Sequence, residues 1–240
     1  MRKFGLIGFP LTHSFSSNYF AKKFGIEKVF DASYNSYEID DLDDLHYLVE
    51  TEKLSGFNVT IPHKQQIVPH LDSLDYPAAQ MNAVNCVKVI AGKLFGFNTD
   101  YIAFKITIAH YARNGQKALI FGDGGSSVAV KYALRKLGIS YKTVSRKSAA
   151  ELSYTDLNYA TIKEFKILIN TTPLGMYPKT DACIDIPYNA IGSSHLCYDL
   201  VYNPTETLFL KKAKEQGAII KNGLEMLEIQ ADRSWDIWNS

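Results

Sequence analysis

Apolar residues in the first hundred positions fall into short runs separated by mixed stretches. The run at 3–9 has the length of a strand and ends at Pro10. A β-branched run at 57–61 stops at Pro62, a residue that ends strands because it cannot donate to the ladder. Further strands are predicted at 34–39, 84–90 and 93–97, the last two joined as a hairpin by Ala91-Gly92, and helices at 16–24, 42–52 and 64–68. Interspersed strands and helices predict a mainly parallel sheet covered on both faces.

The pattern after a predicted linker helix at 101–111 is that of a second α/β unit. A buried strand at 117–121 leads into a glycine-rich turn, a helix at 127–137 and a second strand at 140–145. This order is the first half of a dinucleotide-binding βαβ unit. Three more strands are predicted at 166–170, 195–200 and 218–221, and a final amphipathic helix by Leu224, Leu227, Ala231, Trp235 and Trp238.

The composition indicates the class of protein, and the distribution of charge indicates which segment binds a ligand. The 240 residues are 46% hydrophobic with a formal net charge of +1, which excludes disordered, collagen-like and coiled-coil classes and argues against a nucleic-acid partner. Residues 1–101 carry 9 Lys+Arg and 12 Asp+Glu, a net charge of −3, whereas 102–222 carry 16 and 9, a net charge of +7. The basic segment contains the glycine-rich turn, which indicates an anionic ligand there; a solvated, lysine-rich surface is the alternative.

The cysteines predict neither a disulfide framework nor a metal site. Cys86, Cys183 and Cys197 are far apart in the chain, which is typical of a protein of the reducing cytoplasm. The N-terminus is too short and too broken by glycine and proline for a signal peptide, and no apolar run reaches the roughly 20 residues that span a bilayer. The histidines have no ligand spacing either, so we expect no metal and no membrane partner.

The turn Gly122-Asp123-Gly124-Gly125-Ser126 follows a strand and opens a helix, which is the context that a pyrophosphate-binding turn requires. Its first glycine permits the tight turn, and the second lets the backbone approach a pyrophosphate at the helix N-terminus. The third position of the pattern is serine, so the match is partial. Asp123 adds a carboxylate close to the expected phosphates.

The end of the second strand indicates which dinucleotide binds. A free ribose 2′-OH is usually held by an acid about 20 residues past the first glycine, and the stretch 142–148 contains none. Ser145, Arg146 and Lys147 offer a hydroxyl and two cations instead, which suit a 2′-phosphate. The sequence therefore favours NADP over NAD, with an exposed basic loop as the alternative.

Four segments of the first unit carry many hydroxyl, amide and ionisable groups at predicted strand ends: 8–16, 56–64, 82–85 and 96–100. Each alone is compatible with capping and turn chemistry. Together with Asn170-Thr171-Thr172-Pro173-Leu174-Gly175-Met176, 199–207 and 222–231 they resemble the shikimate dehydrogenase family nearly end to end.

The resemblance implies NADPH-dependent reduction of 3-dehydroshikimate to shikimate in aromatic amino-acid biosynthesis. It implies a two-domain α/β fold: a substrate domain of residues 1–101 completed by the C-terminal helix 223–240, and a Rossmann-like NADP-binding domain of residues 102–222. Lys64 and Asp100 match the catalytic pair. The matching substrate positions are Ser14, Ser16, Thr60, Asn85, Tyr202 and Gln230, and the matching cofactor positions include Thr171, Met176 and Gly223 beside the turn and strand-end residues above. The chain departs from the family pattern at Ser17, Asp123 and Ser126.

Reduction of a ketone needs a hydride and a proton, and Lys64 is the side chain suited to supply the proton. Two other readings stay open. One is a quinate/shikimate dehydrogenase with broader cofactor use, and the other is a non-catalytic NADP(H)-binding regulator on the same fold. We expect a monomer or a homodimer.

Overall fold

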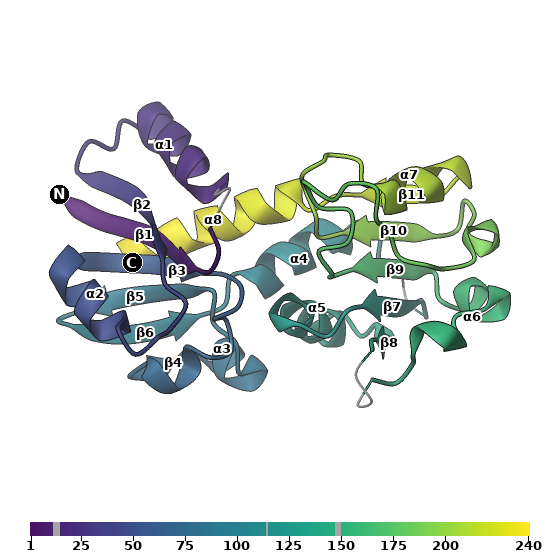
Figure 1. Cartoon of the computed structure of the whole chain (residues 1–240), viewed down its shortest axis with the longest axis horizontal. Helices are drawn as coiled ribbons and strands as arrows, with labels where there is room; N and C mark the ends of the chain where they lie inside the picture. Colours follow the sequence, from purple (N-terminus) through teal and green to yellow (C-terminus); the bar gives the residue numbers. More distant parts are fainter. Residues whose placement is uncertain (12–14, 114, 147–149) are drawn as a thin grey trace. The chain divides into compact units, whose positions relative to one another are not determined.

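The chain folds as two compact α/β units, each built around its own sheet (Figure 1). The computed structural model describes residues 1–11, 15–113, 115–146 and 150–240. One unit contains Met1–Asp100 and Glu228–Ser240, and the other contains Tyr101–Leu227. The α/β class predicted from the strand and helix pattern is confirmed.

The sheet of the first unit has six strands in the order β2-β1-β3-β5-β6-β4. β1 pairs in parallel with β2 and β3, whereas β5 is antiparallel to both of its neighbours. Because β2 and β3 lie on opposite sides of β1, the connections diverge at the carboxyl end of β1, where open sheets place ligands. The elements are β1 (Arg2–Gly8), α1 (Phe15–Glu27), β2 (Ala32–Glu38), α2 (Leu45–Glu52), β3 (Leu54–Val59), β4 (Ser73–Leu74), α3 (Tyr76–Met81), β5 (Cys86–Ile90), β6 (Lys93–Phe97) and α4 (Asp100–Ala109).

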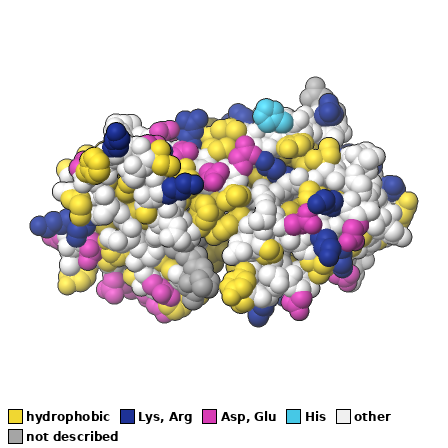
Figure 2. All heavy atoms as spheres, turned by 90° about the horizontal axis from the view of Figure 1, so that it is seen from above, with side chains coloured by type: hydrophobic (Ala, Val, Ile, Leu, Met, Phe, Trp, Pro, Cys, Tyr) yellow, Lys and Arg dark blue, Asp and Glu magenta, His cyan; other side chains and the backbone are white. Residues whose placement is uncertain are grey.

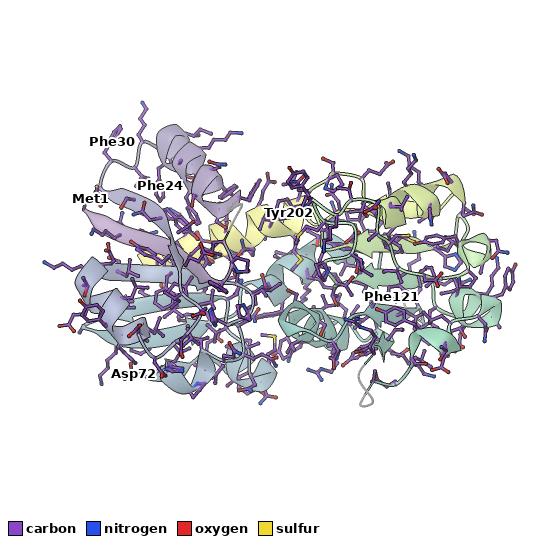
Figure 3. All side chains as sticks on the ribbon, in the orientation of Figure 1. Met1, Phe24, Phe30, Asp72, Phe121 and Tyr202 are labelled. Carbon is purple, nitrogen blue, oxygen red and sulfur yellow. The ribbon has the colours of Figure 1, made fainter. Side chains whose placement is uncertain are left out.

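Both faces of this sheet are covered by apolar side chains. One face packs against α2 and α3 around Phe57 and Leu94, and the other packs against α1 and the C-terminal helix α8 (Leu224–Asn239). Phe24 on α1 belongs to the second layer (Figure 3). There the Trp238 ring stacks on Phe4, and its Nε1 donates to the Val87 carbonyl at 2.9 Å. Gly56 leaves the room that this ring fills, since a Cβ at Gly56 would lie 2.4 Å from it.

The sheet of the second unit is entirely parallel, with the order β11-β10-β9-β7-β8. Its central strands are buried along their length, which is why they read in the sequence as continuous apolar runs. The connections diverge at the carboxyl end of β7, between β8 and β9. The elements are β7 (Lys117–Phe121), α5 (Gly125–Lys136), β8 (Ser140–Val144), α6 (Tyr159–Glu164), β9 (Ile167–Asn170), β10 (Leu196–Asp199), α7 (Leu208–Glu215) and β11 (Ile219–Lys221).

The helix predicted at 64–68 is wrong. Residues 61–67 form turns, followed by one turn of 3₁₀-helix at Val68–His70. The carbonyl of Lys64 accepts from the Val84 N–H at 2.7 Å instead of from a residue of its own segment. Pro69 has no N–H with which to continue a helical ladder. A contact with a distant segment therefore determines the backbone around Lys64.

Candidate active site and nucleotide-binding turn

Lys64 lies just beyond the carboxyl ends of two neighbouring strands. Thr60 follows β3, and its N–H donates to the Ile7 carbonyl of β1 at 2.9 Å. Gly8, the last residue of β1, permits this approach, since a Cβ there would lie 2.4 Å from Thr60 Cγ2. The bond between Lys64 and Val84 then holds the segment beside the start of β5. The edge where the connections diverge thus carries Thr60 and Lys64.

Lys64 and Asp100 form a buried ion pair. Lys64 Nζ lies 2.7 Å from Asp100 Oδ2, and the two side chains are only 12% and 8% exposed. Asp100 is the first residue of α4, where the helix dipole favours a negative charge. The pair places an ammonium group in a protected position at the carboxyl edge of the sheet.

An amide network holds the Asp100 carboxylate from its other oxygen. Asn85 Nδ2 lies 2.9 Å from Asp100 Oδ1, 3.0 Å from Thr99 Oγ1 and 3.3 Å from Gln230 Oε1. Asn85 Oδ1 accepts from the Thr99 N–H at 2.6 Å, which fixes the orientation of the amide. The structure thus brings together four of the sequence-predicted site residues: Lys64, Asp100, Asn85 and Gln230.

A second buried network adjoins this one and was missed at the sequence level. The Tyr34 hydroxyl donates to Asn58 Oδ1 at 2.9 Å, and Asn58 Nδ2 donates to Ser234 Oγ at 2.8 Å. Burial raises the pKa of the Tyr34 phenol, and a hydrogen bond with Ser16 acts in the opposite direction. Polar Asn58 at a buried strand position was the available signal. Ser16 lies in the first turn of α1, whereas predicted Ser14 lies outside the described residues.

The glycine-rich turn of the second unit has the backbone that a phosphate requires. Gly122 has φ of +105°, and its N–H donates to the Val144 carbonyl at 2.9 Å. Thr171 bonds the Phe121 carbonyl through both its N–H and its hydroxyl, at 2.9 and 2.8 Å. Gly124 caps α5 without a side-chain bond, and a Cβ there would meet nothing within 4 Å. The first turn of α5, with Gly125 and Ser126, therefore offers backbone N–H groups beside open space, and the turn fits a dinucleotide pyrophosphate.

The neighbouring strand ends where the 2′-phosphate is expected. Ser145 is buried directly after β8, and Arg146 beyond it is exposed; Lys147 lies outside the described residues. Glu151 returns to this strand and accepts from the Thr143 N–H at 2.9 Å. That backbone bond helps to lower the pKa of the Glu151 carboxyl, although burial acts in the opposite direction. The acid absent from 142–148 in the sequence is thus present beside β8 in space.

Three further predicted residues lie in loops of the second unit. Tyr202 follows β10, partly buried, and burial raises its pKa (Figure 3). Met176 is 45% exposed in the loop after β9. Gly223 precedes α8. Packing alone requires glycine at this position, because a Cβ there would lie 2.0 Å from the Leu200 carbonyl oxygen.

A buried carboxylate at the end of β10 joins the end of β9 to the loop that follows β10. Asp199 accepts from Thr207 Oγ1 at 2.5 Å, from Asn170 Nδ2 at 2.9 Å and from the Val201 N–H at 3.0 Å. Burial raises the pKa of Asp199 to about 6, although all three donors act to lower it. Thr207 also caps α7, so the carboxylate ties that helix to the sheet.

Neither a metal centre nor a membrane helix is found in the part of the chain that the structure describes. No three His, Cys, Asp or Glu side chains there converge as metal ligands, and none of its helices has the length and apolarity needed to cross a bilayer. On the face drawn in Figure 2, cationic and anionic side chains are interspersed.

Known proteins resemble the whole chain. Residues 6–87 match the model of the shikimate dehydrogenase substrate binding domain. Shikimate dehydrogenase (NADP(+)) of Methanococcus maripaludis is 39% identical over 98% of this chain and 90% of its own length. The chain belongs to the shikimate dehydrogenase family.

Solved shikimate dehydrogenases have the same fold. The enzyme from Aquifex aeolicus superposes with a TM-score of 0.90 at 32% identity, covering 100% of this chain and 92% of that one. The enzyme from Thermus thermophilus, solved with NADP(H) and shikimate, gives 0.87 at 30% identity, covering 99% and 93%. The fold that the family resemblance implied is thereby confirmed for the residues of both units.

Proposed function

We propose that this protein catalyses the reversible NADPH-dependent reduction of 3-dehydroshikimate to shikimate. The buried Lys64–Asp100 pair within the Asn85 and Gln230 network is the observation that carries the proposal. A non-catalytic regulator has no need for an ammonium–carboxylate pair held in this way. The names and bound ligands of the relatives support the same substrate and cofactor.

Lys64 is the proton donor in the proposed reaction. NADPH, when bound, supplies the hydride that the carbonyl carbon receives. The carbonyl oxygen then gains negative charge, which the Lys64 ammonium stabilises before it transfers its proton. In the reverse direction the neutral amine takes the proton from the hydroxyl. Asp100 orients the ammonium through the 2.7 Å contact and leaves its other oxygen to Asn85.

Hydroxyl and amide groups of the first unit hold the substrate in this proposal. Ser14 and Ser16 bind the carboxylate, and Thr60, Asn85 and Gln230 bind ring hydroxyls together with Asp100. The family resemblance assigns Tyr202, a residue of the second unit, to the substrate as well. The fixed amide of Asn85 supports this role, because a preoriented donor loses little freedom when it binds.

The second unit holds NADPH. The pyrophosphate binds at the start of α5, where it accepts hydrogen bonds from the turn formed by Gly122, Gly124, Gly125 and Ser126. Ser145, Arg146 and Lys147 bind the 2′-phosphate, to which a guanidinium offers a planar pair of donors. Thr171, Met176 and Gly223 lie beside the nicotinamide in this assignment.

The free cysteines support a reducing, cytoplasmic site of action. Cys86, Cys183 and Cys197 are unpaired, and burial raises the pKa of both Cys86 and Cys197 to about 12, so these two are poor nucleophiles. A monomer or a homodimer satisfies the proposal, because it draws every site residue from one chain.

One assay tests the function against both alternatives. Reduced nicotinamide is followed while shikimate or quinate is offered with NADP or NAD to the purified chain. We expect turnover with shikimate and NADP. Preference for quinate, or equal use of NAD, would assign a quinate/shikimate dehydrogenase instead. NADP binding without turnover of any pair would assign the regulator.

A further inference from the structure

Asp123 is an unexpected residue for an anion-binding turn. It lies between Gly122 and Gly124, and Gly124 is the N-cap of α5. Backbone N–H groups at such a helix start bind phosphates. A free carboxylate at this position opposes a bound anion by charge repulsion. It also competes with that anion for the helix N-terminus.

Lys131 of α5 reaches back to this carboxylate. Its Nζ lies 2.6 Å from Asp123 Oδ1, and the Lys131 and Asp123 side chains are 21% and 27% exposed. Lys131 also lies within the electrostatic influence of Glu151, whose pKa it helps to lower. One ammonium therefore compensates the acid of the turn and acts on the acid beside β8.

Strand register places Asp123 next to the expected 2′-phosphate site. Phe121 of β7 pairs with Val144 of β8, and the Gly122 N–H bonds the Val144 carbonyl. Asp123 and Arg146 each lie two residues beyond that pair, at the same edge of adjacent parallel strands. Whatever anion Arg146 binds thus also experiences the net charge of the Asp123–Lys131 pair.

We propose that the Asp123–Lys131 ion pair sets the preference of this turn for NADPH over NADH. Lys131 neutralises the Asp123 carboxylate and holds it toward the second turn of α5. The glycine-rich turn can therefore bind a dinucleotide that carries a 2′-phosphate. Removal of the Lys131 charge makes the Asp123 carboxylate repel that phosphate more strongly, while the carboxylate tolerates a free 2′-OH, the group that acids bind in NAD-specific folds. This inference rests on the proposed use of NADPH.

The test measures binding rather than turnover. Dissociation constants of NADPH and NADH are obtained from reduced-nicotinamide fluorescence, without shikimate, for the wild type, K131A, D123A and the double variant. Calorimetry with 2′,5′-ADP and 5′-AMP isolates the 2′-phosphate. K117A is the matched control, since Lys117 forms a 2.6 Å pair with Glu164 at the opposite end of β7.

We expect the NADH-to-NADPH ratio of dissociation constants to fall about two- to fivefold in K131A and to rise about twofold in D123A, the scale of partly exposed charge pairs. In the D123A background the loss of Lys131 changes the ratio less, and K117A leaves it unchanged. K131M keeps the aliphatic stem and must repeat the K131A result. Equal effects on both dinucleotides, or no effect, overturn the inference. Failure of the wild type to bind NADPH contradicts the proposed function instead.

Discussion

Lys64 Nζ and Asp100 Oδ2 lie 2.7 Å apart although 36 residues separate them in the chain. The contact forms because both residues follow strand ends at one edge of the first sheet. It gives the site a cation whose position is fixed before substrate binds. Its contribution is measurable at either partner.

Replacement of Lys64 by alanine removes the proposed proton donor. General acid catalysis contributes about 10² to 10⁴ in rate, so we expect kcat to fall by that factor with a modest change in KM. Steady-state kinetics with shikimate and NADP measure both parameters. K93A serves as the control, because Lys93 is an exposed residue at the start of β6. Near-normal kcat in K64A would remove Lys64 from the mechanism.

Asp100 is expected to act through Lys64, which a double-mutant cycle detects. D100N keeps the size of the side chain and removes the charge that orients the ammonium. We expect kcat to fall about tenfold or more in D100N and the double variant K64A/D100N to lose hardly more than K64A alone, since residues that act as a unit are non-additive. Additive losses would show two independent roles.

The sequence identified candidate site residues that the fold brings together, whereas it predicted part of the local structure around them wrongly. Polar segments at predicted strand ends indicated the edge of the sheet where a ligand binds, and the family resemblance then singled out Lys64, Asn85 and Asp100 within them. Gln230 came only from the family resemblance, because no local pattern ties residue 230 to residue 85. The segment 64–68 was predicted as a helix from its local pattern. That pattern carries no information on the long-range contact with Val84, which determines the backbone there.

Other elements were missed although their signals were present. Asp75 caps α3 by accepting from the Ala78 N–H at 2.8 Å, and Pro77 lies in the first turn, which together mark a helix start. Thr207 marks α7 in the same way. The Asp123–Lys131 contact had no such signal, because a helix places residues three or four apart together, and these are eight apart across a turn.

Buried Asp199 predicts a pH dependence of stability. Its pKa is about 6 in the folded protein against 3.8 ordinarily, so the folded state binds this proton more tightly than the unfolded state. The group therefore destabilises the fold at neutral pH, and stability is gained as pH falls from about 6 toward 4. The difference amounts to about 3 kcal/mol at 1.36 kcal/mol per pKa unit.

D199N removes this titration and isolates it from that of other carboxylates. Urea unfolding followed by circular dichroism gives the free energy of unfolding of both proteins between pH 4 and 8. We expect the free energy of unfolding of the wild type, minus that of D199N, to rise by about 3 kcal/mol as the pH falls through this window. A constant difference would place the folded pKa of Asp199 at its ordinary value.

Two glycines predict opposite effects of the same substitution. At Gly223 an added methyl group lies 2.0 Å from the Leu200 carbonyl oxygen and 2.6 Å from its carbonyl carbon, so backbone must shift. At exposed Gly25, inside α1, a Cβ meets nothing within 4 Å. We expect G223A to lose about 1–3 kcal/mol of unfolding free energy through overpacking. G25A is expected to gain about 0.5–1 kcal/mol, because alanine loses less backbone freedom than glycine in a helix. Thermal and urea unfolding of the two variants measure both values, and the loops around Leu200 would be shown to yield freely if G223A were as stable as the wild type.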